Sequence, residues 1–254
     1  MKKIILSLFI LFYAINLLAQ EDTLSVDEKQ TPYDLLSSYY SGKFKPFKKG
    51  NFFAGLAFSL TDKKLENTDY LIQQVIDGDR LSYDVLVKGG YYTGDYGMVL
   101  LNLNYFQDKF SGTIYRDPDT LQSNTISRGF AVTPAIRSSV PLTKSERLSF
   151  FTEIGLTFGK TNSLTRNTKN LDEIEKIYGD DFHFRVGLSP GITFFAMENF
   201  AFEVELNVLG YDLRVSESSK NNGPKSREVR QNVDFNIDLL SLQLGLAYYF
   251  GANK

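Results

Sequence analysis

The chain has 254 residues, with 28 Lys and Arg against 30 Asp and Glu, one His and no Cys. This length fits one large β or α/β domain, or two small ones. The absence of Cys excludes a disulfide framework, a thiolate metal site, a cysteine nucleophile and a lipid-anchored cysteine. A single His argues against a multi-histidine metal centre, so we expect no metal and no other cofactor. The net charge of −2 leaves no excess of positive charge that would favour binding to nucleic acid.

The first residues have the pattern of an export signal. Met1-Lys2-Lys3 is basic, Ile4–Leu18 is almost wholly apolar, and the small residue Ala19 follows. This order is typical of a cleaved secretory signal peptide. The alternative is an N-terminal membrane anchor, but the 15 residues of the apolar run are fewer than the ~20 that a spanning helix needs. We therefore predict a signal peptide over residues 1–19 and an exported protein.

A polar leader, residues 20–50, comes before the next patterned region. Thr31 and Pro32 are typical of the start of a helix, and Gly42 is typical of the residue just past its end. This pattern predicts a short helix in the leader.

From Asn51 onward, apolar residues recur at every second position, which indicates strands with one apolar face. The apolar face changes parity between Leu239 and Leu240, where a β-bulge would insert one residue. Eight such segments follow one another, each of roughly ten to twelve residues, a length that suits a tilted crossing of a bilayer. The segments are 52–61, 81–92, 98–105, 129–140, 148–158, 182–194, 200–208 and 240–250, the last preceded by 233–239 in the opposite parity.

The connections between the segments alternate in length. Short turns occur at Thr93–Asp95, Pro141–Arg147 and Ala196–Asn199. The other connections are polar stretches of about twenty residues, which we predict to be surface loops, as in an up-and-down barrel with a loop end and a turn end. These stretches are Asp62–Arg80, Gln107–Ser127, Lys160–Asp181 and Asp212–Gln231.

Alternation alone does not say which solvent the apolar face meets, because a soluble ligand-binding barrel hides its apolar face inside. The opposite face of these segments is rich in Gly, Ala, Ser and Thr, which suits the narrow interior of an eight-stranded barrel. Aromatic residues also gather near both ends of the segments, as in the girdles of a membrane barrel. Both observations favour an apolar face turned toward lipid.

The predicted fold class is therefore all-β: an eight-stranded antiparallel up-and-down transmembrane β-barrel over residues 51–250, followed by a tail, 251–254. Lipid offers no hydrogen bonds, so the first strand at Asn51 and the last strand ending at Phe250 must pair. An even number of strands places both termini at the turn end, the periplasmic side in bacterial outer membranes.

The signal peptide, eight alternating strands and closing segment Leu246-Ala247-Tyr248-Tyr249-Phe250 resemble small outer-membrane β-barrel proteins of the OmpX/OmpA-barrel and PorT-like kind. The resemblance covers residues 51–250 and implies a protein of the cell outer membrane that contacts its lipids. It also implies that the barrel-assembly machinery reads the last strand, with Leu246, Tyr248 and Phe250 as the candidate assembly signal. Envelope proteins that bind the loops or the leader are further expected partners.

Charged side chains on the inward face form a candidate lumen network. Three cations and four acids in a narrow tube should pair, because an unpaired charge away from water is costly. The functional interpretation is an ion path or a lumenal binding site, and the structural one is a salt-bridge network that fills the interior. The candidate residues, together with one histidine, are Asp84, Lys88, Arg137, Glu153, His183, Arg185, Glu203 and Glu205.

These features predict a non-catalytic envelope protein that displays surface loops or acts as a subunit of a secretion or assembly complex. The alternative is a small porin-like pore or passive transporter. A lipid-modifying enzyme is the third hypothesis, since a serine with His183 would supply the chemistry. The phase of His183 points into the barrel, however, and no serine motif of recognisable spacing accompanies it.

Overall fold

The computed structural model describes residues 44–69, 74–170, 173–235 and 243–252. All of these residues belong to the larger of the two compact units of the chain, residues 42–254. No helix of this described part is long and apolar enough to cross a membrane. The predicted signal peptide, the predicted helix of the leader and the predicted bulge at Leu239–Leu240 lie outside it.

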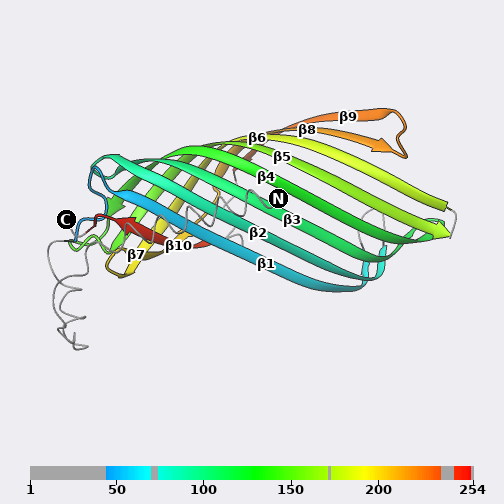
Figure 1. The fold of residues 1–254 in the computed structure, drawn as a ribbon, viewed down its shortest axis with the longest axis horizontal. Coiled ribbons are helices and arrows are strands. Elements are labelled where there is room, and N and C mark those ends of the chain that lie inside the picture. The colour runs from blue at the N-terminus through cyan, green and yellow to red at the C-terminus, as the bar shows by residue number, and fades with distance from the viewer. Residues whose placement is uncertain (1–43, 70–73, 171–172, 236–242, 253–254) are drawn as a thin grey trace, which may run out of the picture. The chain divides into compact units, whose positions relative to one another are not determined.

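The described residues form ten β-strands, and β1 to β6 lie side by side as long oblique ribbons (Figure 1). The strands are β1 (Phe52–Asp69), β2 (Gln74–Gly94), β3 (Gly97–Arg116), β4 (Asp119–Pro141), β5 (Leu148–Asn170), β6 (Glu173–Met197), β7 (Phe200–Glu205), β8 (Leu209–Lys220), β9 (Lys225–Phe235) and β10 (Gln243–Phe250).

Eight of these strands close into a ring. Neighbours pair in the order β1-β2-β3-β4-β5-β6-β7-β10, and β10 returns to β1. Every pairing is antiparallel, and the closing register sets Phe52 opposite Phe250. The predicted fold class is confirmed: the chain is an all-β, eight-stranded antiparallel up-and-down barrel whose first and last strands pair.

β7 and β8 are two parts of the seventh strand. Both pair with β6, with Gly191 opposite Glu205 and Leu188 opposite Leu209. Between them, the N–H of Leu206 donates to the carbonyl oxygen of Pro190 over 3.0 Å. The step on β6 is 191 − 188 = 3 residues and the step on its partner is 209 − 205 = 4. The seventh strand therefore contains a one-residue β-bulge.

The stretches predicted to be long loops are strands instead, which corrects the sequence analysis. β1 to β6 have 18 to 25 residues. β3 and β4, for example, are joined by Asp117 and Pro118 alone. Beyond the bilayer both faces of a strand meet water, so the alternation of apolar and polar residues fades while the backbone ladder continues.

The apolar face points outward, as predicted. On β3, Leu101 and Leu103 are each 48% exposed, whereas Asn102 between them is 7% exposed. An apolar exterior around a polar interior excludes the soluble ligand-binding barrel. We call the outward side chains of 52–60, 81–91, 99–105, 130–140, 150–158, 182–194, 200–204 and 244–250 the apolar belt.

Arg in place of Leu101 should destabilise the folded barrel by about 2–4 kcal/mol, because it places a charge near the middle of the apolar belt. Ser111→Arg lies on the same strand and the same face but beyond the belt, and should cost about 0–1 kcal/mol. Urea unfolding of the protein in phospholipid vesicles measures both free energies. Equal values for the two variants would show that the belt does not face lipid.

Candidate functional site in the barrel lumen

An aromatic plug fills the turn end of the lumen. Phe47 lies just before β1 and is 1% exposed, and its ring centroid is 5.8 Å from those of Phe195 on β6 and Tyr249 on β10. Phe44 packs edge-on against the same Phe195 at 4.8 Å. The buried cluster comprises Phe44, Phe47, Phe53, Tyr92, Met98, Leu100, Ala135, Phe195, Ala201, Ala247, Tyr249 and Ala252. The chain that enters β1 thus folds back into the barrel.

Polar contacts hold this entering segment in place. The N–H of Lys45 donates to the carbonyl oxygen of Ala252 over 2.7 Å, and Asn51 Nδ2 donates to the carbonyl of Lys45 over 2.9 Å. Lys45 Nζ also donates to Glu146 Oε1, in the turn between β4 and β5, over 2.6 Å. The hydrogen bond from Lys45 and the charge of Glu146 raise the pKa of Lys45 above its ordinary value. Lys45 therefore keeps its positive charge at neutral pH and loses it only as the pH rises above the usual range of lysine.

A charged layer lies against the plug, centred on Arg137 of β4. The Arg137 guanidinium donates to Glu153 Oε2 over 3.0 Å and to Glu203 Oε1 over 2.7 Å. Its charge also lies over the ring of Phe151, 4.0 Å from the centroid, and over that of Phe53. Arg137 is 2% exposed. A buried guanidinium needs this number of partners, because each unpaired charge in the interior carries a large desolvation cost.

Four further side chains extend the charged layer. Lys88 on β2 pairs with Glu205 on β7, and its Nζ is 3.4 Å from Glu153 Oε2. Asn102 Nδ2 donates to Glu153 Oε1 over 2.6 Å, and Tyr249 Oη donates to Glu203 Oε1 over 2.8 Å. The five charged groups of the layer, listed next, sum to +2 − 3 = −1. They are Lys88, Arg137, Glu153, Glu203 and Glu205.

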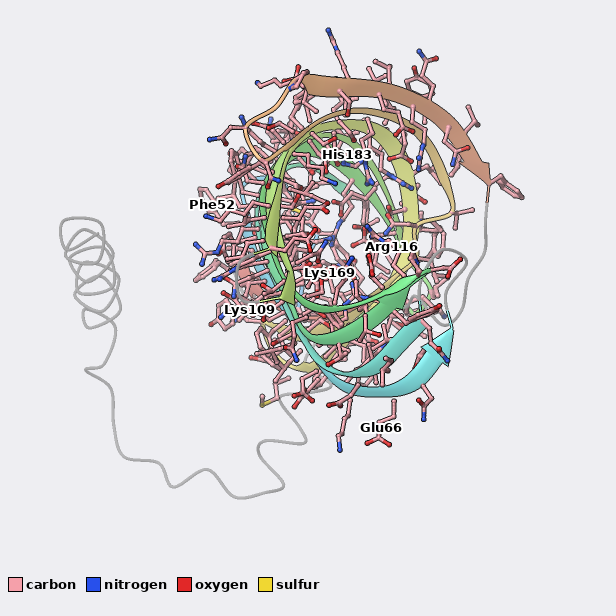
Figure 2. The ribbon with its side chains drawn as sticks, turned by 90° about the vertical axis from the view of Figure 1, so that its right-hand side faces the viewer. Phe52, Glu66, Lys109, Arg116, Lys169 and His183 are labelled. Atoms are coloured by element: carbon pink, nitrogen blue, oxygen red, sulfur yellow. The ribbon has the colours of Figure 1, made fainter. Side chains whose placement is uncertain are left out.

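A second cluster lies farther along the strands, toward the loop end. His183 Nε2 is 2.6 Å from Asp212 Oδ1, and Arg185 Nη1 donates to Asp212 Oδ2 over 2.8 Å. In the view along the ring, His183 lies on its inner side (Figure 2). On β2 and β3, Asn104 Nδ2 donates to both oxygens of Asp84.

A cavity of about 600 Å³ lies beside both clusters. Lys88, Glu153 and Glu205 of the charged layer line it, as do His183 and Arg185 of the second cluster. Small residues line the β4–β5 wall, where a Cβ on Gly155 would lie 2.8 Å from Thr133 Cγ2. The cavity is therefore polar, and the charged layer and the plug lie between it and the turn end.

The structure places all eight predicted lumen residues on the inner face but divides them. Five form the charged layer, His183 and Arg185 join the second cluster, and Asp84 pairs with Asn104. Sequence reasoning missed Asp212, which it placed in a loop, although continuing the seventh strand sets Asp212 opposite Arg185. The candidate assembly residues Leu246, Tyr248 and Phe250 are exposed on the outer face of β10.

In the part of the chain that the structure describes, no group of three or more His, Cys, Asp or Glu residues is arranged to hold a metal ion.

The fold and this lumen define an eight-stranded barrel with an apolar exterior and a polar, plugged interior. No protein-family model and no curated protein matches the chain. Among solved structures, it is similar to Ail, the attachment invasion locus protein of Yersinia pestis, at 13% identity and a TM-score of 0.35, covering 80% of this chain and 99% of Ail. It is also similar to a major outer membrane protein from Thermus thermophilus, at 12% identity and a TM-score of 0.34, covering 79% and 99%.

Arg137→Leu should destabilise the barrel by about 3–5 kcal/mol, because it leaves Glu153 and Glu203 buried without their main partner. Adding Glu153→Gln and Glu203→Gln should recover much of this loss, since the two remaining charges are then removed as well. The free energy of unfolding of wild type, single and triple variants measures the coupling. A triple variant as unstable as the sum of its separate substitutions would contradict a shared network.

Proposed function

We propose that this protein is a non-catalytic, non-conducting barrel of the cell outer membrane that displays rigid β-hairpins beyond the bilayer. A cleaved signal peptide exports it, and both of its termini lie in the periplasm. The observation that carries this proposal is the length of the strands. A tilted crossing of the membrane takes about 9–11 residues, whereas β6 has 25.

The strand residues beyond those needed to cross the bilayer continue to pair with the neighbouring strands. β3 and β4 stay in register from Tyr105 opposite Phe130 to Arg116 opposite Asp119. Inward ion pairs cross the extension, such as Arg80 with Asp108 at 2.7 Å. A paired sheet of this kind presents side chains in fixed positions, which suits recognition by another molecule at the surface. Display therefore takes place on strands rather than on flexible loops.

The plugged lumen supports a non-conducting protein over a porin-like pore. Phe151 and Tyr249 are fully buried, and Arg137 fills the space between the β4–β5 wall and β7. An eight-stranded barrel is only wide enough for side chains to fill its interior. A role as a subunit of a secretion or assembly complex uses the same exposed hairpins with a protein partner.

The absence of native cysteine allows the orientation to be tested with single cysteines. Asn222→Cys, in the turn between β8 and β9, should react with a membrane-impermeant maleimide on intact cells. Lys144→Cys, in the turn between β4 and β5, should react only after the outer membrane is permeabilised. Both residues are exposed, so a difference reports the side of the membrane. The reverse labelling pattern would overturn the proposed orientation.

Planar-bilayer recordings test the proposal that the lumen does not conduct. Purified protein should give no discrete openings, because the plug and the charged layer fill the turn end. Stable openings of the wild type that disappear with Glu153→Gln and Glu205→Gln would instead establish a pore through the charged layer.

A further inference from the structure

The outer face of β3, β4 and β5 beyond the apolar belt carries cations and no acids. Along each strand the outward side chains are alternate residues: 107–115 on β3, 120–128 on β4 and 160–168 on β5. The charged residues among them are Lys109, Arg128, Lys160 and Arg166, which we call the cationic sector. All four are exposed. Figure 2 shows Lys109 on the outside of the ring.

The cationic sector begins directly where the aromatic girdle ends. Arg128 and Lys160 are each two residues beyond an outward phenylalanine, Phe130 and Phe158, and Lys109 is four residues beyond Tyr105. At about 3.3 Å per residue these steps are roughly 7 and 13 Å. Aromatic girdles lie at the lipid–water interface, and long Lys and Arg side chains lie along apolar surface with their charges at its polar edge. Lys109, Arg128 and Lys160 therefore lie at the depth of the lipid head groups.

The protein leaves most of this charge unneutralised. Lys160 pairs with Asp180 on β6 at 3.1 Å, through two half-exposed side chains. Within the described residues, Lys109, Arg128 and Arg166 have no ion-pair partner.

The neighbouring strands show the opposite charge. The outward face of β1 and β2 beyond the belt has four acids and one cation: Asp62, Glu66, Asp77, Asp79 and Lys64. The barrel thus has a basic side and an acidic side at the same height.

The surface of the cationic sector is also hollowed. One hollow of about 460 Å³ is lined by Lys109, Arg166 and one acid, Asp79. Another of about 510 Å³ has a balanced lining of two cations and two acids: Arg128, Lys225, Asp180 and Glu217. Ile126 and Leu164, opposite each other in the β4–β5 register, line both hollows. In the first hollow the cations outnumber the acid, so an anionic group with an attached hydrocarbon chain would match its combination of positive charge and apolar surface.

We propose that the cationic sector binds the phosphate groups of anionic lipid head groups, and that it holds these lipids against β3, β4 and β5 but not against β1 and β2. The inference rests on the proposed membrane location. The ligand is the lipid phosphate rather than free phosphate, because the cations border the lipid-facing belt directly.

The test uses the full-length mature protein in two kinds of vesicle, phosphatidylcholine alone and phosphatidylcholine mixed with phosphatidylglycerol. Flotation with the phosphatidylcholine vesicles first establishes membrane insertion, and failure at this step overturns the proposed function itself. Spin-labelled phosphatidylglycerol and phosphatidylcholine then report which lipid the inserted barrel retains. We expect a preference for phosphatidylglycerol of roughly fivefold or more, the factor that one surface cation contributes.

Two triple variants that remove the same charge test which cations cause the preference for phosphatidylglycerol. Lys109→Gln, Arg128→Gln and Lys160→Gln together should abolish it. Lys64→Gln, Lys144→Gln and Lys220→Gln remove the same charge from exposed sites outside the cationic sector and its hollows, and should leave the preference intact. An inserted wild type without a preference, or equal losses in the two variants, would overturn the inference. Loss of the preference when phosphate replaces chloride at constant ionic strength would show that the sector binds free phosphate instead.

Discussion

A backbone N–H or C=O without a partner in hydrocarbon costs several kcal/mol, and this cost determines the architecture of the chain. A sheet that crosses lipid must close, so Phe52 at the start of β1 pairs with Phe250 at the end of β10. Closure in turn makes an inside and an outside, and the two-residue period of a strand assigns every side chain to one of them. The apolar belt and the polar lumen are both consequences of this single requirement.

A ring of eight strands is about wide enough for side chains to fill, so most polar groups of its interior must pair with one another. The protein does this in two ways along the lumen. At the turn end Phe44 and Phe47 enter from the segment before β1 and fill the space with aromatic rings. Next to them, Arg137 draws Glu153 and Glu203 together across the lumen. Farther along, where the cavity opens, His183, Arg185 and Asp212 are only partly buried and stay beside the wall.

The faces of the strands and the closing pair could be predicted because both follow from the contrast between lipid and lumen. Leu101 and Asn102 differ in burial in the way their alternation indicates. The ends of the strands could not be predicted in this way. Period-two alternation reports that two faces meet different surroundings, and it stops where both faces meet water, even though Gln107 still pairs with Arg128. Asp212 was assigned to a loop for this reason. Phe44 and Phe47 carry no periodic signal, because their burial depends on the chain turning back into the barrel.

The surroundings change along each strand, and the pairing of the strands also differs between the two ends of the sheet. At the turn end the ring is complete, with β10 paired to both β1 and β7. Farther along, within the described residues, β9 pairs with β8 alone. An unpaired edge is tolerable in water when charged side chains protect it, and Lys225, Arg227, Glu228 and Arg230 lie on this strand. Within the described residues, the ring is closed by β10 at the depth of Phe52–Leu56 and Phe200–Glu205. Beyond that depth, contact with water and with the lipid head groups determines which side chains the strands carry.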